Sequence, residues 1–196
     1  GIDTSSGVIS VRTVDAGTTG VSGELSFVSG TTSSGSSGSI TVGSGKSVAG
    51  KGGTIALSVG AGSTRTGGDV LISSGEISMN TGGSVSYMSG YGSSLSSGSI
   101  VVGSMNAGTA GVSGNFQFMT GTSSSGASGL ISITTGKSTG GKGGDILISG
   151  TMSSTNEGAG VGIIAGKTSA INRKGGDMAV TAGYSTANNN AGGGNV

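Results

Sequence analysis

Three short segments carry the Gly-Lys-Ser/Thr sequence that closes a phosphate-binding loop: Gly45-Lys46-Ser47, Gly136-Lys137-Ser138 and Gly166-Lys167-Thr168. A complete loop needs another glycine five positions before the last one, so that backbone N–H groups can surround the phosphates. Ile40, Ile131 and Val161 occupy that position instead. The pattern therefore fails in the same way three times, and a turn glycine followed by a solvated lysine explains all three segments.

Asp69, Asp145 and Asp177 each follow a Gly-Gly pair, an arrangement that loosely resembles the calcium-binding nonapeptide repeat. Such a calcium site needs acidic residues in successive turns, but neighbouring repeats here carry Thr54 and Ser84 near the same phase. We therefore expect no metal site and no cofactor. The three carboxylates are instead expected to cap turns or to pair with nearby lysine or arginine.

The chain contains few residues of the types that act in catalysis, because histidine and cysteine are both absent. A serine nucleophile needs an adjacent base, and the few carboxylates form no evident pair on one face. We therefore predict that the protein is not an enzyme. With 9 basic and 8 acidic residues the net charge is +1, so no long-range electrostatic field favours binding of nucleic acid. No apolar run is long enough for insertion into a membrane.

A short phrase repeats every 15 or 16 residues: an apolar residue, any residue, another apolar residue, then Ser, Thr and Gly. We call each unit a repeat and number its positions from the first apolar residue. The first positions are Ile9, Leu25, Ile40, Ile55, Val70, Val85, Ile100, Phe116, Ile131, Ile146, Val161, Met178 and Val196. This period predicts an all-β fold, a single-stranded β-solenoid of about 13 coils with a thin, flattened cross-section.

Alternating apolar residues at positions 1 and 3 are typical of a strand with one buried face. They predict a core ladder of stacked side chains, exemplified by Ile40, Val42, Ile55, Leu57, Val70, Ile72, Val85 and Tyr87. Apolar residues on the opposite side of the strands predict a face for lateral contact, because a contiguous exposed apolar strip usually marks an interaction surface. This lateral face comprises Val28, Leu71, Met88, Val101, Met119, Leu147 and Ile164.

A longer period overlies the short one, because residues 16–57 return as residues 107–148, an offset of six repeats. No change in composition divides the chain, so residues 1–196 are predicted to form one continuous solenoid domain. Val196 is expected to begin a further strand, and unprotected strand edges favour pairing with another copy of the chain.

The segment SGSSGSITVGSGKS, followed by GKGGTIALSVG, resembles the Gly/Ser-rich tandem repeats of large secreted or cell-surface proteins, such as algal and diatom matrix proteins and solenoid adhesin stalks. The resemblance implies an extracellular structural role. The expected function is a filament or matrix element that assembles with itself, end to end and side by side, with Ser and Thr as candidate sites for glycans. The alternative is a surface-binding solenoid, either an adhesin stalk that binds glycans or an ice-binding protein similar to insect and plant antifreeze proteins.

Overall fold

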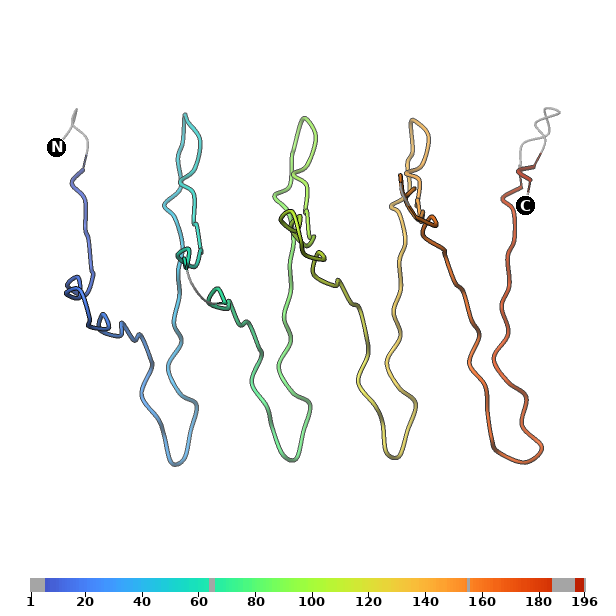
Figure 1. Cartoon of the computed structure of the whole chain (residues 1–196), viewed down its shortest axis with the longest axis horizontal. Helices are drawn as coiled ribbons and strands as arrows, with labels where there is room; N and C mark the ends of the chain where they lie inside the picture. The colour runs from blue at the N-terminus through green and yellow to red at the C-terminus, as the bar shows by residue number, and fades with distance from the viewer. Residues whose placement is uncertain (1–5, 64–65, 155, 185–192, 196) are drawn as a thin grey trace. The chain divides into compact units, whose positions relative to one another are not determined.

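The computed structural model describes residues 6–63, 66–154, 156–184 and 193–195 (Figure 1). Within these ranges the backbone forms neither a helix nor a strand, and it consists of extended segments joined by bends. The chain divides into two units, Gly1–Ile100 and Val101–Val196. Each unit contains one of the two similar 42-residue segments, 16–57 and 107–148.

The prediction of a β-solenoid is wrong for the structure described. In a solenoid each residue lies beside the equivalent residue one repeat later and pairs with it through the backbone. Here the backbone hydrogen bonds span shorter separations, as in Gly83 N–H to Gly75 C=O at 3.0 Å and Gly98 N–H to Gly90 C=O at 3.0 Å. The chain therefore closes loops on itself and does not lay one repeat upon the next.

The composition of each repeat gives the physical reason for this outcome. A repeat offers two large apolar side chains in about fifteen residues, and glycine, which loses the most conformational freedom on ordering, makes up 46 of the 196 residues. Two side chains per repeat bury too little apolar surface to offset the entropy of ordering so many glycine-rich positions. A regular apolar phase is therefore not sufficient to specify a packed ladder.

The short sequence period does appear in the backbone, as a series of bends at matching intervals. Turns or bends occupy residues 18–19, 33–35, 48–50, 63, 78–80, 93–95, 109–110, 124–126, 139–141, 154, 156 and 170–172. Figure 1 shows extended chain between these points. The bend at 170–172 contains Asn172 with a φ of 59°, a left-handed conformation that asparagine adopts more readily than most residues.

A close approach at the base of each loop involves a glycine two residues before position 1 and the residue at position 5 of the preceding repeat. A Cβ atom added to Gly53 would lie 3.2 Å from Ser44 Cβ, and one added to Gly83 would lie 3.1 Å from Ser74 Cβ. The same relation joins Gly129 to Thr120, at 3.3 Å from its Cγ2. Each repeat therefore contains a loop that is closed within about ten residues.

No described residue is buried, and this holds for the residues of the predicted core ladder. Their exposed fractions are 57% for Ile40, 57% for Ile55, 52% for Val70 and 46% for Val85, so no stacked neighbours cover them. The described residues also include no helix that is long and apolar enough to cross a membrane. Val196, where a further strand was expected, lies outside the described residues.

Candidate association surface

The two sides of the extended segments differ in how far their apolar side chains are exposed. At position 1, Val85, Phe116 and Ile131 are 46%, 49% and 49% exposed. On the opposite side, Val101 and Ile164 are 91% and 93% exposed. Position 1 is thus about half exposed in these three repeats, although Ile9, at position 1 of the first repeat, is 93% exposed.

We call the side that carries positions 1 and 3 the rung side. The rings of Phe116 and Phe118 meet edge to face, with centroids 4.6 Å apart and planes at 87°, so positions 1 and 3 of this repeat share one side of the backbone. Within the predicted ladder, the remaining members are Val42, Leu57, Ile72 and Tyr87, and their exposed fractions are 76%, 76%, 56% and 66%. The rung side therefore presents a pair of apolar side chains in each repeat, with space around both.

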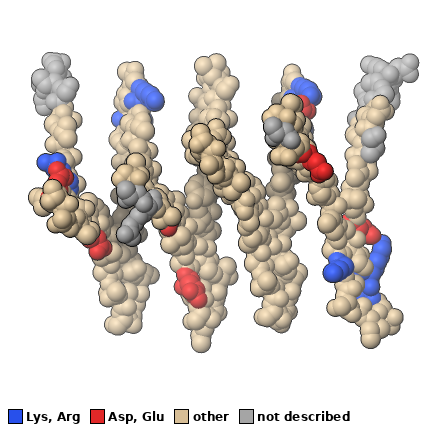
Figure 2. All heavy atoms as spheres, viewed as in Figure 1, with Lys and Arg blue, Asp and Glu red and all other residues tan. Residues whose placement is uncertain are grey.

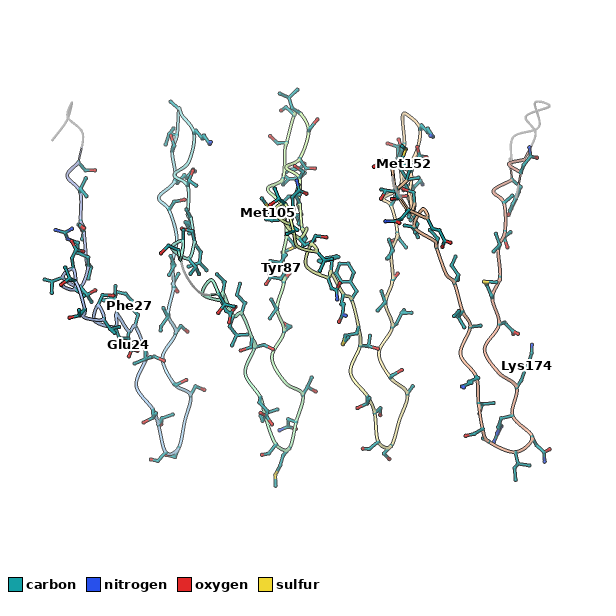
Figure 3. The ribbon with its side chains drawn as sticks, in the orientation of Figure 1. Glu24, Phe27, Tyr87, Met105, Met152 and Lys174 are labelled. Atoms are coloured by element: carbon teal, nitrogen blue, oxygen red, sulfur yellow. The ribbon has the colours of Figure 1, made fainter. Side chains whose placement is uncertain are left out.

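The predicted lateral face is more exposed than the rung side. Its members Val28, Leu71, Met88, Met119 and Leu147 have exposed fractions of 83%, 89%, 86%, 76% and 86%. No other part of the described chain covers them, and Figure 3 shows side chains projecting along the length of the ribbon. Within the described residues, both sides of the extended segments are therefore open to a partner.

Hydroxyl groups at position 8 stabilise the bends, a role that the sequence analysis missed. Gly50 N–H donates to Ser47 Oγ at 2.9 Å, Gly126 N–H to Ser123 Oγ at 3.0 Å, and Gly141 N–H to Ser138 Oγ at 3.0 Å. Serine followed three residues later by glycine or asparagine is a familiar turn pattern, so the spacing alone could have indicated it.

The same hydrogen bonds explain the Gly-Lys-Ser/Thr tripeptides. Ser47 and Ser138 each accept a hydrogen bond from their own loop, and Thr168 Oγ1 accepts one from Ala170 N–H at 3.1 Å. A phosphate-binding loop would instead direct this hydroxyl toward a bound metal ion. The geometry is that of a braced turn.

Charged side chains form isolated pairs in the loops. Lys142 Nζ lies 2.8 Å from Asp145 Oδ2, and Lys174 Nζ lies 2.8 Å from Asp177 Oδ1. All four side chains are at least 72% exposed, so each pair contributes little to stability. Asp145 and Asp177 thus pair with a nearby lysine, one of the two roles expected for them.

Among the described residues no cluster of three or more potential metal-ligating side chains occurs, and no pocket is enclosed by the chain. The described residues do present exposed apolar side chains and extended backbone, and contiguous exposed apolar side chains commonly mark an interaction surface.

Comparison with known proteins gives no further guide: no protein-family model matches the chain, and no curated protein or solved structure shows significant similarity to it.

Proposed function

We propose that this chain is a structural protein segment that associates with copies of itself to build a filament or matrix. The observation that carries the proposal is the amount of surface left open. The accessible surface is 19647 Å² for a chain of 18.2 kDa, whereas a folded monomer of this mass exposes about 8,000 Å². A stable protein interface buries only about 1,600 Å², so the surplus exceeds this need several-fold.

The backbone supports the same proposal. Folded proteins make about one internal hydrogen bond per residue, and the described residues make only a few, located mainly at the loops. Extended backbone with free N–H and C=O groups can pair with another extended chain, as an uncovered strand edge does. A second copy would supply equivalent extended segments at the same intervals, because the bends recur with the sequence repeat.

The net charge of the chain poses no obstacle to this association. The net charge of +1 is spread over 196 residues, so two copies repel each other only weakly. The proposed placement outside the cell depends on the resemblance to Gly/Ser-rich tandem repeats of secreted and cell-surface proteins. The proposal of self-association is supported by the exposed surface and by the extended backbone.

The test is sedimentation velocity of the full chain over a wide range of concentrations, combined with far-ultraviolet circular dichroism and electron microscopy. We expect larger species to grow with concentration and a strand signal to grow with them, because backbone pairing would occur between copies. Elongated particles should then be visible in micrographs. A chain that stays monomeric at every concentration would contradict the proposal, and ice shaping by that monomer would favour the surface-binding alternative.

A further inference from the structure

Residues 77–136 contain no lysine, arginine, aspartate or glutamate, although charged residues lie on both sides of this stretch, at Glu76 and Lys137. We call residues 77–136 the uncharged stretch. In Figure 2 most of the visible blue and red atoms lie on the outer parts of the chain, and the light-green to yellow part of Figure 1 is drawn mainly in tan. All of its residues lie within the described part of the chain.

The uncharged stretch also holds most of the aromatic residues and methionines of the protein. Four of its residues are aromatic, out of 3 Tyr and 3 Phe in the whole chain, and four are methionine, out of 6. They are Tyr87, Tyr91, Phe116, Phe118, Met79, Met88, Met105 and Met119. Aromatic residues and methionine are enriched at protein interfaces, whereas lysine and glutamate are depleted there.

These side chains are available to a partner. Tyr91 is 90% exposed, Met79 is 91% exposed and Met105 is 87% exposed, and the least exposed large apolar side chain of the stretch, Val85, is still 46% exposed. Figure 3 shows Tyr87 and Met105 projecting from the backbone. The stretch therefore combines the densest interface-type side chains with the lowest charge in the chain.

The absence of charge selects the partner. When two identical segments lie parallel and in register, each residue lies beside its own copy. Every charged residue then lies close to a residue of the same charge. Such pairs are unfavourable across paired strands. The uncharged stretch alone avoids this cost over several consecutive repeats, whereas the flanks would bring Lys46 beside Lys46 and Lys142 beside Lys142.

We infer that residues 77–136 are the element that starts self-association, and that its occupant is the same stretch of a second copy, aligned in register. This inference rests on the proposed function and names the segment and the alignment through which that function begins. Low net charge and the absence of proline, two features of this stretch, are among those of segments that pair readily in extended form. The charged flanks then limit association elsewhere, as charges beside apolar segments commonly do.

The internal duplication supplies a matched pair of variants for the test. Phe118 corresponds to Phe27 in the first copy of the 42-residue sequence, and the two side chains are 70% and 68% exposed. Both stand at position 3 of a repeat, but only Phe118 lies in the uncharged stretch. Because neither residue is buried, a substitution at either position removes no folded core.

The experiment compares the full-length chain with F118K and F27K by sedimentation and light scattering. We expect F118K to weaken association at least tenfold, because it places like charges opposite each other in the pairing segment. F27K should weaken association no more than about threefold. Equal effects of the two variants would overturn the inference and leave self-association intact, whereas a monomeric wild-type chain would overturn the proposed function itself.

A mixing experiment tests the alignment. F118K and F118E should each associate poorly alone, and an equal mixture should recover association to within about threefold of the wild type, because opposite charges then meet in register. No recovery in the mixture would overturn the in-register alignment. As a second readout, the chain has no cysteine, so a single S104C variant should form disulfide-linked dimers on mild oxidation faster than a single S44C variant does. Equal rates would contradict the assignment to residues 77–136.

Discussion

The rings of Phe116 and Phe118 lie edge to face, with centroids 4.6 Å apart, although only one residue separates them in the sequence. Alternate residues of an extended backbone point to the same side, so this contact fixes the local conformation of that repeat as extended. It does so without a neighbouring chain. The one-sided arrangement of apolar residues is therefore a local property at this repeat, independent of any packed core.

We expect the isolated chain to lack a cooperative unfolding transition. No described residue is buried and the described backbone forms neither helix nor strand, so heating or urea exposes little additional apolar surface. Circular dichroism of a dilute sample should change gradually with temperature, and the dependence on urea should be nearly flat. A sharp transition with a normal urea dependence for a protein of this size would show that a packed core exists.

Ser138→Ala should weaken the bend at 139–141 without affecting other repeats. It removes the acceptor of the 3.0 Å hydrogen bond from Gly141 N–H. A hydrogen bond of this kind contributes about 0.5–1 kcal/mol, so we expect the amide of Gly141 to exchange with solvent about two to five times faster. Ser138→Thr keeps the hydroxyl and serves as the control. Unchanged exchange in the alanine variant would show that the hydroxyl does not brace the bend.

Gly150→Ala should open the loop that Ala159 closes. A Cβ at residue 150 would lie 2.5 Å from the carbonyl oxygen of Ala159, and backbone atoms would have to move to accommodate it. We expect the hydrogen bond from Ala159 N–H to Thr151 C=O, 3.0 Å long, to break, and exchange of that amide to increase about fivefold.

Gly45→Ala is the matched control for this substitution, because no atom lies within 4 Å of a Cβ at residue 45. Exchange at Gly50, in the same loop, should then change less than about twofold, a free-energy difference smaller than one net hydrogen bond. Equal increases in amide exchange in the two alanine variants would mean that glycine matters at these sites for its backbone freedom and not because a Cβ atom lacks room.

Lys142→Gln should leave self-association almost unchanged. The ion pair of Lys142 with Asp145 is 2.8 Å long, but the side chains are 80% and 76% exposed, so water and salt screen it strongly. We expect the association constant to change less than about threefold and its salt dependence to stay weak. A larger loss would show that the charged flanks take part in association.

The sequence identified the interval of the chain's local structure and not its fold. The spacing from Ile40 to Ile55 reappears in the bends at 33–35 and 48–50, because turns follow local glycine and serine chemistry. The packing of Ile40 on Ile55 was also expected, but it needs long-range burial, and two such side chains per repeat do not supply enough. The positions of the turns could thus be predicted from local residue types. Tertiary structure depends on the total apolar area that the fold buries, and the spacing of apolar residues does not give that area.

The candidate association surface was also predicted only in part. Val28 and Leu71 were predicted to belong to a face for lateral contact; both are more than 80% exposed, and their contact with a partner stays a prediction. The role of Ser47 and Ser138 in the bends was missed, because both were considered only as part of a Gly-Lys-Ser segment. The Ser-x-x-Gly spacing at both sites carried that information.

Loops that close within about ten residues have a consequence for the length of the protein. Because Gly53 meets Ser44 and Gly83 meets Ser74, each loop is complete without reference to distant parts of the chain. Loss or gain of whole repeats would therefore leave every remaining loop with its own partner. A gene that encodes such a chain can gain or lose repeats by recombination between the repeated segments. Each resulting chain keeps the same loops and differs in length.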